Sequence, residues 1–321
     1  MPQPTLSDVH VNRPLTNISI AFIQAAEDFI ADRVFPNVPV TKKSDRYFVY
    51  DKDFWFKDEA EKRAPGTESA GTGFEVDNTP NYNADIWALH KDVDDQTRAN
   101  TDQPLDADRD ATMYVTQKLL LRKEKIFTAA YFTTSIWTGS TTGGDITPGT
   151  KWDVASSTPI EDVDAQQDAV KEKTGFRPNV LVVGPGTHRA LKNHPDIRDR
   201  IKYVQKAILT VDLLASLFGV DKYLVANATE NTATEGATGS FSFLYGNNAL
   251  LVYAAPNPGI MIPSAGYTFS WTGYLGATQA GTRMKKFRMN HLESDRVEGD
   301  MAIDMKQIAA ELGVFFLNTL T

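Results

Sequence analysis

A glycine-containing turn at residues 184–189, "GPGTHR", is the first place where this sequence could do chemistry. It follows an apolar segment typical of a strand and opens a helix, and free amide groups at a helix start can hold a phosphate. The turn lacks the third glycine of a dinucleotide-binding loop and the Gly-Lys-Ser/Thr of a P-loop. The pattern therefore favours a tight strand-to-helix turn over a phosphate site.

Candidate metal ligands are dispersed along the chain. No two of the five histidines have metal-ligand spacing, and solvated surface histidines are expected for His188 and His194, although Asp196 lies in the same segment. The carboxylates Asp92, Asp94 and Asp95 have no glycine-turned ligand loop, so a solvated charge run is favoured over a calcium site. We expect no metal and no cofactor.

Catalytic patterns are equally sparse, because no Gly-x-Ser-x-Gly elbow occurs. The tryptophans are expected to be packing residues; they are Trp55, Trp87, Trp137, Trp152 and Trp271. Since no convergent catalytic set emerges, we predict that the protein is not an enzyme.

Composition sets wider bounds. The chain has 321 residues, 41% of them hydrophobic, and a net charge of −8, which argues against a protein that wraps nucleic acid tightly. Cysteine is absent, which suits a reducing cytoplasm. No secretory signal and no apolar run of membrane-spanning length is evident.

The first half of the sequence predicts extended parts with little core of their own. Residues 17–35 predict a short arm helix capped by Asn17 and followed by "FPNVPV". Two β-type segments, "RYFVY" at 46–50 and "DIWAL" at 85–89, flank a charged, glycine-containing stretch at 57–73 with no periodicity. Such a stretch is expected to be functional or mobile.

A long helix is predicted at about residues 105–132. Asp102 would cap it and Pro104 would lie in its first turn. At 1.5 Å per residue its length would be roughly 40 Å, so it resembles a strut. Val115 and Leu119 are expected to face β-strands, and "RKEK" at 122–125 interrupts the apolar stripe with charge.

A compact α/β unit follows. "TPIE" at 158–161 predicts a capping box, and Gly175 predicts the end of that helix. A second helix is expected at 210–219, and residues 228–240 predict a polar excursion. Three strands complete the layer; they are expected at 179–183, 222–227 and 248–254. The C-terminal part is β-rich, and its strands are expected to pack on the long helix.

This order of elements resembles the major capsid proteins of tailed bacteriophages with the Hong Kong 97-type fold. The segments that carry the resemblance are "ADIWALHKDVDDQTRANTDQPLDADRDATMYVTQKLLLRKEKIF" and "GFRPNVLVVGPGTHRALKNHPDIRDRIKY". The resemblance implies an α+β fold in four parts: an N-terminal arm (1–45), an extended β-hairpin loop (46–92), a peripheral domain with a spine helix and β-strands (93–154 and 261–321), and an α/β axial domain (155–260).

The implied function is a structural head protein that self-assembles into hexamers and pentamers of an icosahedral shell around double-stranded DNA. It would act in the virion capsid after assembly in the host bacterial cytoplasm, without a membrane. The implied partners are other copies of the chain, scaffolding, portal and decoration proteins, and weakly contacted DNA. A separate scaffolding protein is expected. The basic residues Lys285, Lys286 and Arg288 could still touch DNA or neighbouring subunits.

The hairpin would then find its core on a neighbouring subunit. The candidate contact residues are Phe54, Trp55, Phe56, Lys57, Lys62, Arg63 and Phe74. Some relatives cross-link a lysine of this loop to an asparagine of a neighbour; Lys57 and Lys62 are candidate donors here, and Asn290 and Asn318 candidate acceptors, although ordinary surface lysines are favoured. Two alternatives remain: an encapsulin-like nanocompartment shell, and a soluble α/β enzyme with a ligand site at the Gly184 turn.

Overall fold

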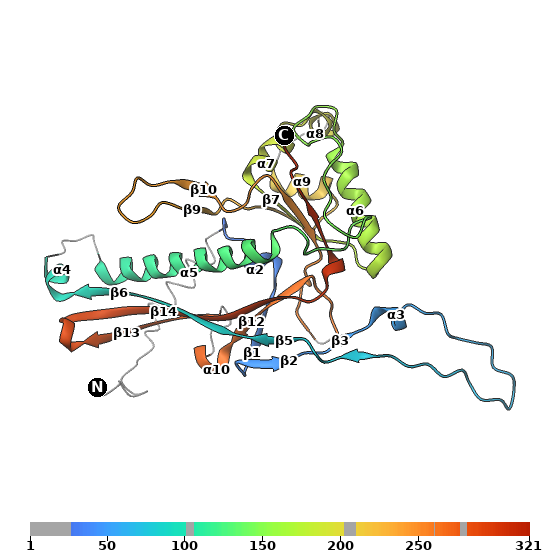
Figure 1. Ribbon diagram of the computed structural model, residues 1–321, viewed down its shortest axis with the longest axis horizontal. Helices are drawn as coiled ribbons and strands as arrows, with labels where there is room; N and C mark the ends of the chain where they lie inside the picture. The colour runs from blue at the N-terminus through green and yellow to red at the C-terminus, as the bar shows by residue number, and fades with distance from the viewer. Residues whose placement is uncertain (1–26, 101–105, 202–209, 260, 277–280) are drawn as a thin grey trace.

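Two large β-sheets, one long helix and a projecting hairpin are the main features of the described part of the chain (Figure 1). The computed structural model describes residues 27–100, 106–201, 210–259, 261–276 and 281–321. The four-stranded sheet lies at one end of the long helix, and the five-stranded sheet runs alongside that helix (Figure 1). The hairpin points away from both sheets (Figure 1).

The five-stranded sheet is built around one long central strand, β14. This strand pairs antiparallel with β6, β13 and β12, while β1 extends the sheet parallel to β12. The bounds are β1 (Asn37–Val40), β6 (Asp85–Asp94), β12 (Gly266–Trp271), β13 (Thr282–Met289) and β14 (Ser294–Gln307). The C-terminal strand β14 thus returns to the segment around "DIWAL" through its pairing with β6.

The long helix α5 (Ala107–Tyr131) packs on this sheet. Its contact is closest at Gly299 of β14, where an added Cβ would lie 2.7 Å from Val115 and 2.8 Å from Leu119. Both side chains are buried. The predicted strand-facing side of the helix is therefore confirmed, and the glycine allows this close approach.

The cap of α5 differs from the expected one. Asp106 is the N-cap, and its carboxylate accepts hydrogen bonds from the amides of Asp108 and Arg109, each at 3.1 Å. Asp102 and Pro104 lie outside the described residues.

The charged stretch of α5 is not a solvated interruption. Lys123 and Glu124 are 4% and 1% exposed. Burial of these charges requires partners, and the start of the chain supplies them. The interpretation of "RKEK" as a simple charged break is therefore wrong for these two residues.

The predicted arm helix at 17–35 is described only from residue 27 onward. In its described part the helix is α2 (Ala31–Val34), and Phe29 and Ile30 precede it. Asn17, Ile20 and Ile23 lie outside the described residues. Phe35 ends this turn and enters the core, where its ring lies 5.2 Å from Phe127 and 4.8 Å from Tyr131. β1 then joins the sheet, so the described arm is bound to its own subunit.

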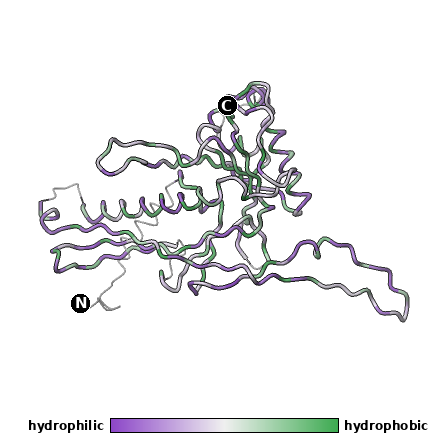
Figure 2. Tube along the Cα trace, viewed as in Figure 1, coloured by the Kyte–Doolittle hydropathy of each residue, from purple (hydrophilic) through white to green (hydrophobic). Residues whose placement is uncertain are grey.

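The four-stranded sheet is buried except at the two ends of one edge strand, Lys222 and Val225. Its order is β15-β11-β7-β8, with bounds β7 (Val180–Val183), β8 (Lys222–Val225), β11 (Ala249–Val252) and β15 (Gly313–Phe316). These strands are mostly hydrophobic in Figure 2. The three predicted α/β strands are confirmed. The expectation that every C-terminal strand packs on the long helix is wrong for β15, which pairs with β11 because its apolar "GVFF" completes this buried layer.

Four helices accompany this sheet: α6 (Pro159–Thr174), α7 (Pro185–Asn193), α8 (Pro195–Ile201) and α9 (Val211–Leu217). Gly175 ends α6 with a φ of 77°, as predicted. The predicted capping box does not form, because Thr158 makes no side-chain cap hydrogen bond and Glu161 pairs instead with Arg200.

The remaining short elements connect these layers. They are β2 (Ser44–Arg46), β3 (Val49–Tyr50), α3 (Lys52–Trp55), β4 (Val76–Asp77), β5 (Asn81–Asn83), α4 (Asp95–Ala99), β9 (Thr229–Asn231), β10 (Phe241–Phe243), α10 (Thr272–Leu275), η1 (Asn290–Leu292) and η2 (Ala310–Leu312). Within the described ranges, no helix has the length and apolar character needed to cross a bilayer.

Candidate intersubunit surface

The projecting hairpin has strands only at its base. β2 pairs with β5 and β3 pairs with β4, the last pair being Tyr50 with Val76. Residues 57–73 form neither helix nor strand and are all exposed. A β-hairpin without a sheet or helix beneath it is marginal in water, so this segment gains little stability from its own chain.

Three aromatic rings from both legs of the hairpin meet at its base. Tyr50, Trp55 and Phe74 form a triangle with centroids 5.9 to 6.3 Å apart. Trp55 and Phe74 are 54% and 59% exposed. Rings that contact one another yet stay open to water form an apolar patch suited to a protein partner.

The first leg of the hairpin contacts residues that border the four-stranded sheet. Lys52 forms an ion pair with Glu311 and donates to the carbonyl of Lys173 at 3.3 Å. Phe56 lies against Gly175, where an added Cβ would be 3.3 Å from its Cζ. Because these contacts hold the base, the aromatic triangle has a defined place although the outer hairpin lacks regular structure.

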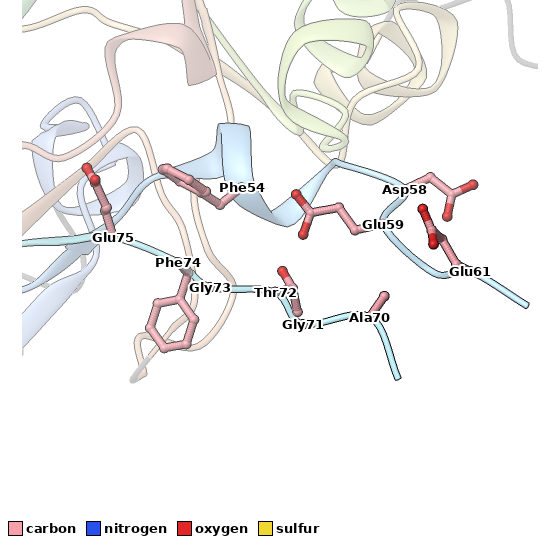
Figure 3. A pocket seen from close by; sticks show the side chains of 10 residues that line it. All are labelled: Phe54, Asp58, Glu59, Glu61, Ala70, Gly71, Thr72, Gly73, Phe74 and Glu75. Atoms are coloured by element: carbon pink, nitrogen blue, oxygen red, sulfur yellow. The ribbon is translucent and has the colours of Figure 1, made fainter. Parts of the chain in front are cut away.

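The outer hairpin is polar. Phe54 and Phe74 lie near the base, with Asp58, Glu59 and Glu61 on one leg and Glu75 on the other (Figure 3). The space between the legs is an open groove of about 840 Å³. Ligand pockets enclose most of the ligand and are mostly apolar, whereas this groove is open and lined by several acidic side chains, which disfavours a small-molecule site.

The seven predicted contact residues fall into four groups. Trp55 and Phe74 come together with Tyr50; Phe54 pairs with Lys57, whose Nζ lies 4.7 Å from the ring centroid; and Phe56 lies on Gly175. Lys62 and Arg63 lie farther out on the hairpin, where Arg63 donates to the carbonyl of Thr67. Their role between subunits stays a prediction.

Sequence reasoning missed exposed apolar residues in this region. Phe48 is 67% exposed and Val76 is also exposed, although both lie in segments with strand character. The alternation of "RYFVY" could have signalled that one face of this short segment lacks a cover.

A second hairpin, β9–β10, presents two more aromatics. Phe241 and Phe243 are both exposed, on the same face of β10. Glu230 of β9 binds Lys125 of α5, which ties the hairpin to the long helix. The sequence predicts only a polar excursion at 228–240, which ends just before these two phenylalanines.

The histidine prediction is wrong for the two residues near Asp196. His194 is 2% exposed, and its Nε2 lies 2.9 Å from the Ser157 hydroxyl. His188 is half-buried, 3.0 Å from the Tyr223 hydroxyl, and burial, with Lys192 nearby, lowers its pKa. Both histidines pack within the chain, and each has one ring nitrogen near a local partner, whereas the buried Nδ1 of His194 has none among the described residues.

The acidic run at 92–95 is used for structure. Asp92 receives two hydrogen bonds from Arg296, and Asp95 receives two from Arg288, which lowers the pKa of each carboxyl. Asp94 caps α4. Among the described residues, no group of three or more His, Cys, Asp or Glu side chains has the arrangement of a metal site.

The basic residues of β13 are paired within the chain. Lys285 binds Glu298 and Asp300, Lys286 binds Asp108, and Arg288 binds Asp95. Their positive charge is therefore largely compensated before any nucleic acid or neighbour approaches.

The turn at Gly184 is tightly packed. A Cβ on Gly184 would lie 2.0 Å from the carbonyl oxygen of Gly246, and one on Gly186 would lie 2.8 Å from the Asn247 side chain. Close backbone approach explains both glycines, in agreement with the tight-turn interpretation.

The cross-linking candidate Asn290 lies far from the candidate lysines within one chain. It is at the turn between β13 and β14, at the opposite end of the molecule from the hairpin with Lys57 and Lys62 (Figure 1). A bond from either lysine to Asn290 would therefore have to join two subunits. Asn318 follows β15, and its backbone amide donates to the side chain of Asn248. Cross-linking stays a prediction.

Comparisons with known proteins agree on one class. Residues 140–257 match the family described as Phage major capsid protein E. The major capsid protein of Burkholderia phage BcepMu is 27% identical over 84% of this chain and 86% of its own length. The major capsid protein of Pseudomonas phage JBD67 is 25% identical over 97% of each chain.

Solved structures share the fold. A phage-related protein from Bordetella bronchiseptica has a TM-score of 0.72 and 20% identity, covering 97% of this chain and 98% of its own. The capsid of cyanophage P-SCSP1u has a TM-score of 0.53 and 12% identity, covering 88% and 85%. With its strut helix, two main sheets and projecting hairpin, this chain has the Hong Kong 97-type fold of tailed-phage capsids and is similar in sequence to phage major capsid proteins.

Proposed function

We propose that the chain assembles into the hexamers and pentamers of a closed icosahedral shell around double-stranded DNA, with hairpin 51–80, the segment between β3 and β5, as an intersubunit element. The observation that carries this proposal is the aromatic triangle of Tyr50, Trp55 and Phe74, held at a fixed base and left open to water. Head-to-tail contacts of one surface with a different surface close into rings, which is how repeated copies form capsomers.

The hairpin's charge suits a polar rim around that apolar patch. Residues 57–73 carry Asp58, Glu59, Glu61, Lys62 and Arg63 on exposed backbone. Charged rim contacts set register and orientation more than affinity, whereas buried aromatic anchors supply most of the binding energy. An active-site lid is disfavoured because the segment has almost no apolar side chain with which to exclude water.

The packaged DNA would touch this wall weakly. The net charge is −8, and the cationic side chains of β13 are engaged in ion pairs with the chain's own carboxylates. A duplex held by few unpaired cations keeps low affinity at physiological salt.

The four-part division also remains part of the proposal: arm 1–45, loop 46–92, peripheral domain 93–154 with 261–321, and axial domain 155–260. β6, the return strand of the loop, pairs with β14 in the five-stranded sheet of the peripheral part. β15, near the end of the chain, pairs with β11 in the four-stranded sheet of the axial part. Scaffolding, portal and decoration proteins would be its partners, and assembly would take place in the host cytoplasm.

An encapsulin-like compartment is the second candidate, since such shells share this fold. The contents separate the two functions: packaged DNA supports the phage head, and a co-purifying enzyme without DNA supports the compartment. Nuclease-protected nucleic acid in purified particles is the direct measurement.

The test of the intersubunit role is to replace residues 57–73 by a short Gly-Ser turn. Circular dichroism and thermal unfolding of the unassembled subunit should stay unchanged, because the segment is exposed and unpaired by strands. Negative-stain microscopy and sedimentation, with any scaffolding protein supplied, should show loss or misdirection of closed shells.

The matched control shortens the other projecting hairpin at residues 234–237. We expect it to retain shells of normal size. Normal closed shells from the 57–73 replacement would refute the proposal, and equal loss in both variants would show that hairpin 51–80 has no special role.

A further inference from the structure

The buried carboxylate of Glu124 joins three parts of the molecule. It lies on α5, and its Oε1 accepts from the amide of Ile30 at 2.9 Å while its Oε2 accepts from the amide of Ala31 at 3.1 Å. The hydroxyl of Tyr245, from the segment between β10 and β11, donates to the same Oε1. One side chain therefore holds the start of α2 and the entry to the four-stranded sheet on a single turn of α5.

Further contacts hold the segments that meet at Glu124. Lys123, whose side chain is 5% exposed, pairs with Asp32 of α2. Asn227, just after β8, donates to Asp28 at 3.2 Å. On the other side, the ring of Tyr245 packs edge-on against Phe132, with centroids 4.8 Å apart.

The three hydrogen bonds at this junction depend on the carboxylate of Glu124, so a small change of that side chain should disturb them. A carboxylate offers enough lone pairs for all three donors, whereas an amide offers one oxygen and places its own donors where acceptors are needed. Burial raises the pKa of Glu124 and, with the Glu124 carboxylate next to it, that of Tyr245, so the tyrosine remains a protonated donor. Buried hydrogen bonds to a charged group are strong, and a donor left without its acceptor is costly.

We propose that Glu124 is a positioning residue that couples arm segment 28–35 to the four-stranded sheet, so that the arm loosens when the contact of Glu124 with Tyr245 is lost. The coupling is physical because Ile30 and Tyr245 share one oxygen atom, although they do not hydrogen-bond to each other. Removing the tyrosine hydroxyl frees the carboxylate to move, and the arm amides then lose a fixed acceptor. The junction thus restrains the arm by way of the sheet.

Hydrogen exchange of the full-length unassembled subunit, read by mass spectrometry on peptides covering 29–35, tests this inference. Glu124→Gln should speed exchange of the Ile30 and Ala31 amides by about tenfold or more, because a hydrogen bond to a charged acceptor is lost. Tyr245→Phe should also speed their exchange, by roughly threefold or more, although no atom is removed that bonds to the arm.

Two controls make the outcome specific. Lys125→Ala removes an exposed neighbour on the same helical turn, with its ion pair to Glu230, and should leave arm exchange unchanged. Exchange of residues 180–183 should stay slow in Tyr245→Phe, which shows that the sheet itself remains folded. Unchanged arm exchange in Tyr245→Phe would overturn the coupling, even if Glu124→Gln fails to fold, and so would an equal increase in Lys125→Ala.

Discussion

Helix α5 and hairpin 51–80 are both long, charged segments, yet they use charge in opposite ways. On α5 the charges of Lys123 and Glu124 are buried and fully partnered by the arm and by Tyr245. On the hairpin the charges are exposed, and its aromatic rings are open to water. The comparison teaches that α5 makes its contacts within the chain, whereas the hairpin leaves charged and aromatic side chains available for a partner.

The largest effect on subunit stability is expected from truncating a side chain at the contact between α5 and β14. Leu119→Ala removes a 4%-exposed side chain beside Gly299 and should lower the free energy of unfolding by about 2–5 kcal/mol. Met113→Ala, exposed on the same helix, should change it by less than about 0.5 kcal/mol. Denaturant unfolding of both variants is the measurement, and equal losses would remove the distinction between the two faces of α5.

Adding one methyl group to each region gives a second contrast. Gly299→Ala would place a Cβ 2.7 Å from Val115, 2.8 Å from Leu119 and 2.8 Å from the sulfur of Met284, and should cost about 1–3 kcal/mol. Gly71→Ala in the hairpin meets no atom within 4 Å and should change stability by less than about 1 kcal/mol. A Gly299→Ala protein as stable as wild type would show that α5 and β14 can separate without cost.

Acid should weaken the end of the five-stranded sheet. Arg296 lowers the pKa of Asp92, and Arg288 lowers that of Asp95. An unfolded aspartate titrates near about 3.9, so this stabilisation is present above about pH 4 and is lost as pH falls through the lower folded pKa values. Melting temperatures from pH 6 to 2 should fall less steeply below pH 4 in Arg296→Met than in wild type; parallel curves would contradict the role of this pair.

The smallest effect on subunit stability is expected from the hairpin aromatics. Trp55→Ser and Phe74→Ser should change the free energy of unfolding by less than about 0.5 kcal/mol, because both rings are more than half exposed. The same variants should impair shell formation, as anchors at an interface do. Phe241→Ser on the other hairpin is the matched control, and a large loss of subunit stability in Trp55→Ser would place that ring in the subunit's own core.

Much of the fold follows from local patterns in the sequence. The apolar spacing of Ala111, Val115 and Leu119 predicts both the long helix and its buried face. Gly175 predicts a helix end because it tolerates a φ of 77°. The absence of periodicity at 57–73 predicts the unstructured hairpin, since neither a helix nor a strand can form there with a buried face.

The candidate surface was less predictable. The individual residues Trp55 and Phe74 follow from composition, but their meeting with Tyr50 depends on the register of β3 and β4. The exposure of Phe241 and Phe243 depends on what the rest of the fold leaves uncovered. Sequence patterns report which side chains share a face, and they do not report whether another segment covers that face.

The sequence by itself determined the order of arm, hairpin, strut helix, α/β layer and returning strands, because periodicity, prolines and glycines act over neighbouring residues. Only the tertiary structure decided that Glu124 and His194 are buried, that Asp92 and Asp95 bind arginines of β14 and β13, and that β15 joins the other sheet. The physical reason is that a buried charge or a paired strand needs partners that are distant in sequence, and only the folded chain brings those partners to it.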